Sequence, residues 1–263
     1  MTATTRASGS AERWGAAWGA QPEGWAATEE QQLPTYEEAL RRVRLEPGWR
    51  VLDVGCGSGV FLRAAADRGA EVYGLDAART LVEIAAARVP EADLRVGDIE
   101  FLPYGDDSFD LVTGFNSFFF AADMTAALRE AGRVAKPGDP VVIQVWGHPE
   151  RCDLTAMLGA VAPLRPQEGQ TGPSLHEPGV LEEIAAEAGL APEDAFDLSW
   201  AYEFADQGAL VQAMLSAGGV VEAVRESGEE AVRDAILDPL KPFRTESGRY
   251  RLENEWHYVI ARP

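Results

Sequence analysis

The chain has 263 residues, of which 46% are hydrophobic, and it carries a formal net charge of −20 at pH 7. This length allows one large domain with a sizeable core. The negative charge argues against nucleic acid and against an anionic membrane surface as partners, because phosphates would be repelled. No apolar run approaches the roughly 20 residues that a membrane-spanning helix needs.

Two further features bear on the cellular compartment. The first eleven residues lack an apolar stretch and predict no secretory signal. The two cysteines, Cys56 and Cys152, lie far apart in the sequence, and we expect free thiols in a reducing compartment rather than a disulfide. A cytoplasmic protein that acts on a small molecule is therefore expected, as a monomer or a homodimer.

The N-terminal region predicts a disordered tail followed by a helical lid. Residues 1–11 are small and polar and form the predicted tail, and residues 12–44 form the lid. Two helices are predicted there, Glu12–Ala20 and Thr35–Arg44, with a break around Pro22–Gly24. Three early tryptophans either dock these helices on the core or cover a ligand: Trp14, Trp18 and Trp25.

Strands and helices alternate between residues 50 and 146. The predicted strands are Arg50–Val54, Glu71–Leu75, Asp93–Val96, Phe109–Gly114 and Val141–Trp146. The predicted helices are Val60–Arg68, Ala77–Val89 and Asp123–Val134. Alternation with short connections indicates βαβ units and an α/β fold with a parallel sheet. The link Gly97–Ser108 is the exception, because its Pro, Gly and Asp residues favour turns.

After the fifth strand the pattern changes. Residues 163–179 hold four prolines and three glycines, which favours a loop. The predicted elements that follow are a helix at Gly179–Ala188, a strand at Ala195–Phe204, a helical insertion at Gln207–Leu240 and a last strand at Tyr250–Ala261. The last strand alternates polar and apolar residues, which is typical of an antiparallel strand.

The segment Val51–Gly59, Val-Leu-Asp-Val-Gly-Cys-Gly-Ser-Gly, is the most informative part of the chain. An apolar strand leads into it and a predicted helix follows. Gly55, Gly57 and Gly59 remove the side chains on one side of the loop, so a ligand can lie directly against the backbone. A tight turn alone would not need three glycines. The pattern predicts a small ligand that carries a ribose or an amino-acid backbone.

Ligands of an open parallel sheet bind beyond the carboxyl ends of its strands. Asp76 follows the second strand and can accept hydrogen bonds from ribose hydroxyls, although a helix N-cap would also explain it. Asp98 and Ile99 follow the third strand and can recognise an adenine. The aromatic run 115–120 after the fourth strand either belongs to the core or walls a pocket.

The glycine spacing indicates which cofactor to expect. Dinucleotide-binding loops have the spacing G-x-G-x-x-G, which accommodates a pyrophosphate at a helix N-terminus. Here the spacing is G-x-G-x-G. This favours a ligand without phosphate, whose amino-acid tail lies along the loop.

Taken in order, the motifs make the chain similar to the class I S-adenosylmethionine-dependent methyltransferases, of the small-molecule, methyltransferase domain 11/25-like type. Beside Val51–Gly59, the resemblance rests on Gly74-Leu75-Asp76, Gly97-Asp98, Leu102-Pro103-Tyr104, Asp107-Ser108-Phe109-Asp110 and Arg133–Gly138. It implies a Rossmann-like, mostly parallel sheet of seven strands with an antiparallel last strand. Helices on both faces and a single domain over residues 12–263 are expected, with a cofactor-binding core at 45–148 and the substrate side at 149–263.

The resemblance also implies S-adenosylmethionine as the cofactor. Its implied contacts at the methionine end are Asp53, Gly55, Cys56, Gly57, Gly59, Phe115 and Asn116. Asp53 would anchor the loop or reach the methionine ammonium through water, and the Phe115 carbonyl would face that ammonium. Asp76 would hold the ribose. The implied contacts around the adenine are Ala77, Asp98 and Ile99.

The implied activity is methyl transfer to oxygen, nitrogen or carbon of an acceptor, and an oxygen acceptor can need a base. The candidate bases are His148 after the fifth strand, His176 in the Pro/Gly loop and Tyr36 in the lid, whereas His257 in the last strand is interpreted as structural. No cluster at ligand spacing predicts a metal site.

Acceptor specificity is expected in residues 12–44, 149–178 and 205–245. Five residues in or next to the last of these ranges form either an apolar pocket or a helical core: Trp200, Tyr202, Phe204, Met214 and Phe243. We favour a small, largely apolar metabolite of secondary metabolism. Three alternatives stay open: an enzyme that uses the cofactor for a non-methylating reaction such as cyclisation, a non-catalytic binding protein, and a nicotinamide oxidoreductase, which the glycine spacing disfavours.

Overall fold

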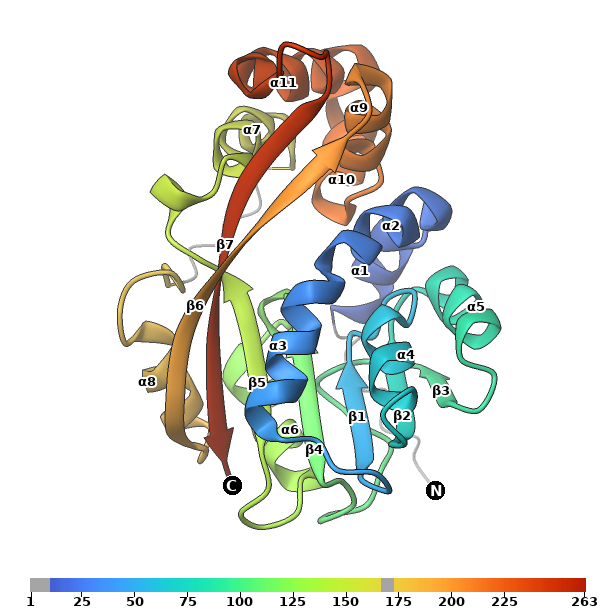
Figure 1. Ribbon diagram of the computed structural model, residues 1–263, viewed down its shortest axis with the longest axis vertical. Helices are drawn as coiled ribbons and strands as arrows, with labels where there is room; N and C mark the ends of the chain where they lie inside the picture. The colour runs from blue at the N-terminus through green and yellow to red at the C-terminus, as the bar shows by residue number, and fades with distance from the viewer. Residues whose placement is uncertain (1–9, 167–172) are drawn as a thin grey trace, which may run out of the picture.

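The computed structural model describes residues 10–166 and 173–263. A seven-stranded sheet in the order β3-β2-β1-β4-β5-β7-β6 forms its centre (Figure 1). The strands are β1 (Arg50–Val54), β2 (Glu71–Asp76), β3 (Asp93–Val96), β4 (Leu111–Phe115), β5 (Val141–Trp146), β6 (Ala191–Phe204) and β7 (Tyr250–Arg262). Strand β7 pairs antiparallel with β5 and β6, and the other pairs are parallel. The predicted Rossmann-like α/β fold with an antiparallel last strand is confirmed.

Helices cover both faces of the sheet (Figure 1). They are α1 (Ala11–Trp18), α2 (Pro22–Glu29), α3 (Leu33–Val43), α4 (Val60–Ala66), α5 (Arg79–Arg88), α6 (Met124–Val134), α7 (Leu154–Val161), α8 (Val180–Glu187), α9 (Gln207–Leu215), α10 (Gly218–Ser227) and α11 (Glu229–Leu240). Short 3₁₀ helices are η1 (Glu30–Gln32), η2 (Phe118–Phe120), η3 (Pro149–Arg151), η4 (Ala162–Leu164) and η5 (Lys241–Phe243).

The apolar run of β1 explains its central position. Adjacent side chains of a strand point to opposite faces, and here both faces are covered. Val51 packs in a core with residues of α3 and α4, whereas Leu52 packs in a second core with residues of α6 and α8. Both side chains are completely buried. The sequence of such a strand is therefore continuously apolar and does not alternate between polar and apolar residues.

The long strands β6 and β7 extend beyond the rest of the sheet as a two-stranded arm (Figure 1). Pairing of β7 with β5 ends where Trp256 lies opposite Trp146, whereas its pairing with β6 continues until Tyr250 lies opposite Phe204. Helices α7, α9, α10 and α11 surround this arm, and we call them the cap. The lid consists of α1, α2, η1 and α3, of which α1 contacts α10 and α2 contacts α9.

The order of the strands determines where in the sheet a ligand site is expected. β1 has β2 on one side and β4 on the other, so the direction of the connections reverses between β1 and β4. Ligands of open α/β sheets bind at the carboxyl ends of the strands at such a reversal. The glycine loop follows β1 at this point, and the lid and the cap lie beside it.

The lid differs from its prediction. Pro22–Gly24 begins α2 instead of breaking the chain, because proline is well tolerated at the first position of a helix. The lid therefore has three α-helices where two were predicted. Ala11, predicted as part of the tail, is already helical. Residues 1–9 of the predicted tail lie outside the described residues.

Other element boundaries also shift. Strand β4 begins at Leu111, and Phe109, predicted as its first residue, forms an isolated bridge with Ala135. Strand β6 begins four residues earlier than predicted, at Ala191, because an edge strand tolerates Pro192. Residues 149–162, before the predicted Pro/Gly loop, form η3 and α7, and the 3₁₀ helix η4 extends into that loop. Residues 167–172 of the loop lie outside the described part of the chain.

Candidate cofactor and acceptor site

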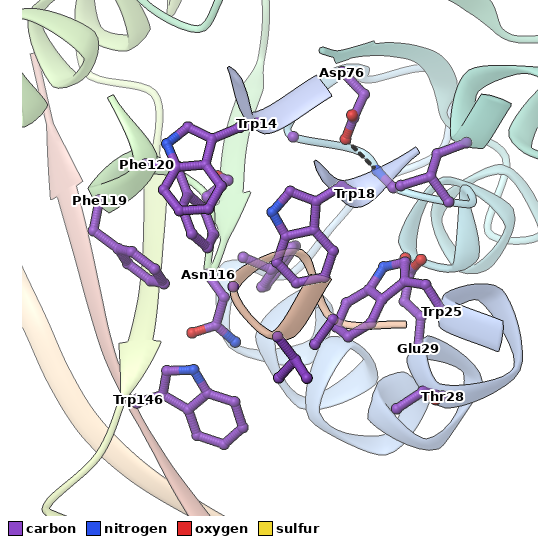
Figure 2. A pocket seen from close by; sticks show the side chains of 18 of the residues that line it. Trp14, Trp18, Trp25, Thr28, Glu29, Asp76, Asn116, Phe119, Phe120 and Trp146 are labelled. Atoms are coloured by element: carbon purple, nitrogen blue, oxygen red, sulfur yellow. Dashed lines mark hydrogen bonds between the residues drawn. The ribbon is translucent and has the colours of Figure 1, made fainter. Parts of the chain in front are cut away.

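A cavity of about 500 Å³ lies at the carboxyl ends of β1, β2 and β4, between the lid and the cap (Figure 2). Nine of the implied cofactor contacts and candidate bases line it: Tyr36, Gly55, Gly57, Asp76, Ala77, Asp98, Ile99, Phe115 and Asn116. They come from five separate segments of the chain. The fold therefore brings most of the implied cofactor contacts to one place.

Asp76, the last residue of β2, holds the glycine loop. Its Oδ2 accepts the N–H of Gly57 at 2.9 Å, and its Oδ1 accepts the N–H of Ala78 at 2.7 Å. Burial raises the pKa of Asp76, and these two backbone donors oppose that shift. A carboxylate offers further lone pairs beyond two bonds, so Asp76 can accept additional donors from the cavity.

Glu29, the last residue of α2, also reaches the glycine loop, and the sequence analysis missed it. Its Oε2 accepts the N–H of Ser58 at 2.8 Å. A Cβ atom at Gly57 would lie 2.6 Å from the same oxygen, and Gly57 has a φ of +53°. Burial raises the pKa of Glu29 to about 7. Nothing in the sequence distinguishes it from the other acidic residues of a chain that has 43.

Three of the implied cofactor residues do not line the cavity. Asp53 is buried and accepts the Thr113 hydroxyl at 2.8 Å, and burial raises its pKa to about 8. Cys56 is also buried, next to Gly74, where a Cβ would lie 2.9 Å from its Sγ. A Cβ at Gly59 would meet Ala85 of α5 at 3.0 Å. In this structure Asp53 and Cys56 support the loop, and Gly59 allows α5 to approach it.

The charge of the cavity is compatible with S-adenosylmethionine. Its acidic lining residues are Glu29, Asp76 and Asp98, whereas the one basic residue among the described lining residues is Arg165, beside the cap. The cofactor carries a sulfonium, an ammonium and two ribose hydroxyls. Buried carboxylates next to the glycine loop are suitable acceptors for such groups. The residues present therefore fit this cofactor.

The rest of the cavity has aromatic and aliphatic walls. Figure 2 shows Trp14, Trp18 and Trp25 of the lid facing Phe119, Phe120 and Trp146 from the sheet side. Trp18 contacts both Trp25 and Phe120 edge-on, with ring centroids 4.5 Å and 5.6 Å apart. Cap residues complete the wall: Leu154, Met157, Leu158, Val161, Met214 and Val220. This half of the cavity suits an apolar ligand.

Asn116 is a polar group on the boundary between the two halves. It has a φ of +51°, in the left-handed region that few residues other than glycine adopt. Its Oδ1 is buried and has no hydrogen-bond partner in the described structure. Its side chain and that of Trp146 both line the cavity (Figure 2). An unpaired amide oxygen at this position can accept a donor from a ligand.

The three predicted bases differ in their position relative to the cavity. Tyr36 lines the cavity, and burial raises the pKa of its hydroxyl well above the ordinary value. His148 and His176 contact each other, with ring centroids 5.6 Å apart, but neither lines the cavity. His257 lies in β7 next to Asp197, with Nδ1 and Oδ1 2.7 Å apart. Of the three predicted bases, only Tyr36 reaches the cavity.

Only some of the five residues predicted for the acceptor pocket line the cavity. Tyr202 and Met214 line the cavity, whereas Trp200, Phe204 and Phe243 do not. Trp200 is 43% exposed on the edge strand β6. Phe204 is buried in the core between the arm and the cap. The arm thus contributes one aromatic residue to the cavity and another to its support.

Residues 10–166 and 173–263 contain neither a membrane-spanning helix nor a metal-binding cluster. No helix there combines the length and apolarity that crossing a bilayer requires. No group of three or more His, Cys, Asp and Glu side chains there could hold a metal ion. Both cysteines are free and buried.

Comparison with known proteins identifies the family. Residues 52–143 match the family described as "Methyltransferase domain". The demethylmenaquinone methyltransferase of Renibacterium salmoninarum is 38% identical over 103 residues, which cover 39% of this chain and 44% of that protein. The ubiquinone biosynthesis O-methyltransferase of Xanthomonas euvesicatoria pv. vesicatoria is 32% identical over 65% of this chain and 77% of that protein. This chain spans about half the length of several curated relatives that it matches.

A solved structure shows the same fold over a longer stretch. Protein BH2331 of Bacillus halodurans C-125 superposes with a TM-score of 0.59 at 19% identity, covering 86% of this chain and 97% of that one. The seven-stranded sheet, the glycine loop and the family match over residues 52–143 agree with one another. The chain belongs to the class I S-adenosylmethionine-dependent methyltransferases.

Proposed function

We propose that this protein transfers a methyl group from S-adenosylmethionine to a small, largely apolar acceptor. One observation supports this most strongly: a single cavity joins the glycine loop and Asp76 to an aromatic chamber under the lid. A cofactor at the loop and an acceptor in the chamber would therefore be neighbours. Holding two reactants in contact and in line supplies much of the rate in such a reaction.

When bound, S-adenosylmethionine supplies a methyl group that its sulfonium makes electrophilic. Asp76 would accept the ribose hydroxyls, while Ala77, Asp98 and Ile99 would enclose the adenine. The aromatic side chains of the lid and the sheet would exclude water from the reacting groups. Tyr36 stays protonated because burial raises its pKa. We therefore assign it an orienting hydrogen bond rather than the role of a base.

The acceptor class follows from the chamber walls. Rings stack on or pack edge-to-face with aromatic side chains, so the walls favour a flat or aromatic acceptor. The unpaired Oδ1 of Asn116 would receive one donor from it. Two relatives are named for demethylmenaquinone and for ubiquinone biosynthesis, and we extend to this chain only the small-molecule, apolar character of such acceptors.

The direct test is transfer of a labelled methyl group. The purified protein would be incubated with S-adenosylmethionine labelled in its methyl group and a panel of phenols, quinols and aromatic amines. Label in a product would support the proposal. Conversion of an acceptor without label would contradict methyl transfer and favour a cyclisation or a related reaction. Cofactor binding without any conversion, together with a stable partner complex, would favour a binding protein.

A further inference from the structure

Two buried side chains of the lid that carry oxygen acceptors line the cavity. Glu29 ends α2, and Gln32 ends the 3₁₀ helix η1 that follows directly. Side chains three residues apart on successive helical turns lie on the same face. Both residues line the cavity, with exposed fractions of 4% and 3%. Figure 2 shows Glu29 at the edge of the cavity next to Trp25.

One of the two side chains has an oxygen without a partner, and the other is a carboxylate. The Oε1 atom of Gln32 is buried and has no hydrogen-bond partner within the described residues. The Oε2 atom of Glu29 accepts Ser58 N–H, and a side-chain hydrogen bond with Ser58 also opposes the rise of its pKa. A buried acceptor without a donor costs free energy. A ligand that supplies several donors at once would remove this cost at Gln32 and could use the further lone pairs of the Glu29 carboxylate.

We propose that the Glu29 carboxylate and the Gln32 carboxamide oxygen together bind the α-ammonium group of the cofactor's methionine part. This inference rests on the proposed function, because it assumes S-adenosylmethionine in the cavity. An ammonium group has three N–H donors and a positive charge, so it can satisfy both oxygens and pair with the carboxylate. The sulfonium has the charge but no N–H, and the ribose hydroxyls have no charge.

The neighbouring groups support an ammonium rather than a carboxylate at this position. Asp76 beside the loop, Asp53 of β1 and Tyr36 of α3 face Glu29 from the sheet and the lid. Arg88 of α5 opposes them, but its guanidinium donates to the Ser58 hydroxyl at 2.9 Å and to Glu30 at 2.7 Å. The environment of Glu29 therefore contains two other carboxyl groups and one cation that is already paired.

The lid would close on the cofactor through this contact. Glu29 and Gln32 belong to the lid, whereas Gly57 and Asp76 belong to the sheet, so an ammonium between them would tie the two together. The same segment carries Trp25, which walls the acceptor chamber. The cofactor would thus complete the chamber before the acceptor enters. A ligand that contacts two elements stabilises the arrangement in which both contacts are made.

The experiment compares three ligands by calorimetric titration. S-adenosylmethionine has both the sulfonium and the ammonium, S-adenosylhomocysteine has only the ammonium, and 5′-methylthioadenosine has neither. Glu29→Gln should weaken binding of the first two by about 10- to 100-fold, the range for a hydrogen-bonded charged group, and should leave the third unchanged. Glu23→Gln is the matched control, since Glu23 is an exposed carboxylate of the same helix and does not line the cavity.

The other outcomes would overturn the inference in distinguishable ways. If Glu29→Gln weakened the binding of S-adenosylmethionine alone, Glu29 would contact the sulfonium instead of the ammonium. If it weakened the binding of all three ligands equally, Glu29 would act by positioning the lid. Unchanged binding with slower turnover would assign it to the acceptor. Failure of the unmodified protein to bind any of the three ligands would instead refute the proposed function.

A melting experiment separates this role from a structural one. Burial raises the pKa of Glu29 from 4.5 to about 7, so the folded state binds more protons than the unfolded state between these values. Its contribution to stability therefore falls as the pH rises through this window. Without ligand, Glu29→Gln should melt higher than the unmodified protein at about pH 8, and the difference should shrink towards about pH 5. A lower melting temperature at the higher pH would contradict a binding role.

A second variant tests the partner residue. Gln32→Met keeps the length and shape of the side chain but removes its unpaired oxygen. It should weaken the binding of S-adenosylmethionine and of S-adenosylhomocysteine by about tenfold, which corresponds to the loss of one hydrogen bond to a charged group. The affinity for 5′-methylthioadenosine should not change. Unchanged affinity for all three ligands would remove Gln32 from the subsite.

Discussion

Among single residues, Asp76 holds the glycine loop and is the residue that we propose for recognition of the ribose. Its two oxygens hold Gly57 and Ala78. Asp76→Ala would remove both bonds and the proposed ribose contacts, so we expect binding of S-adenosylmethionine to weaken by about 1–3 kcal/mol. Calorimetry measures this loss, and circular dichroism checks that the variant folds. An unchanged dissociation constant in a folded variant would exclude Asp76 from the ribose site.

The glycine loop gives a second prediction at the residue scale. A side chain at Gly57 would combine a left-handed φ of +53° with a contact of 2.6 Å to Glu29. Gly57→Val should therefore abolish cofactor binding. Gly48→Val is the control, because Gly48 also has a positive φ, +85°, but open space around its Cβ position. The control should lose about 1–2 kcal/mol of stability through backbone strain and keep its affinity. Tight binding by Gly57→Val would show that the ligand lies elsewhere.

Single residues also show where sequence reasoning ends. The glycines and Asp76 could be found because they directly follow strands, where the fold itself directs ligands. Glu29 and Gln32 could not, because their role depends on how the lid packs against the loop. For Asp53 the motif left two roles open, anchoring the loop or reaching the methionine ammonium through water, and its buried bond to Thr113 agrees with the first. Position in a motif does not fix the direction in which a side chain points.

At the scale of elements, the lid and the cap are joined above the cavity. Trp18 of α1 packs on Gly218 of α10, where an added Cβ would lie 2.8 Å from the indole ring. Beside it, Arg13 of α1 donates to Glu222 of α10 at 2.5 Å and 3.1 Å. Arg165 beside the cap lies 3.6 Å from the same carboxylate. Two arginines from different elements therefore meet at one nearly buried glutamate.

Glu222→Gln tests whether this contact closes the lid. Removing the negative charge should weaken the attachment of α1 by about 1–2 kcal/mol, since one partner is partly exposed. We expect faster hydrogen exchange in residues 11–18 and a higher KM for the acceptor. Arg233→Gln, which affects only an exposed pair within α11, is the control. Unchanged exchange in α1 would show that aromatic packing alone holds the lid.

Helices and strands could be predicted well where the pattern of apolar residues and the lengths of the connecting segments indicate the same element. The five parallel strands from β1 to β5 and the antiparallel β7 follow from their apolar patterns and lengths. The lid was harder, because Pro22 can either break a helix or begin one, and local sequence does not decide between these roles. The extent of β6 was also missed, since its first residues are exposed and carry no apolar pattern.

At the scale of the whole molecule, the fold separates two tasks. The sheet and its loops form the part of the cavity that we propose for the cofactor, next to the strand ends. The lid and the cap, together with η2, Trp146 of β5 and the arm, wall the part that we propose for the acceptor. These segments have little in common with the family motifs. The cofactor class could therefore be predicted from the sequence, whereas the acceptor depends on packing between distant segments.

The central claim is that the cavity beside Gly57 and Asp76 binds S-adenosylmethionine. Calorimetric titration of the purified protein tests it without knowledge of the acceptor. We predict saturable binding of one cofactor per chain, competition by S-adenosylhomocysteine and no binding of a nicotinamide dinucleotide. Absence of saturable binding by S-adenosylmethionine, or binding of the dinucleotide in its place, would contradict the account.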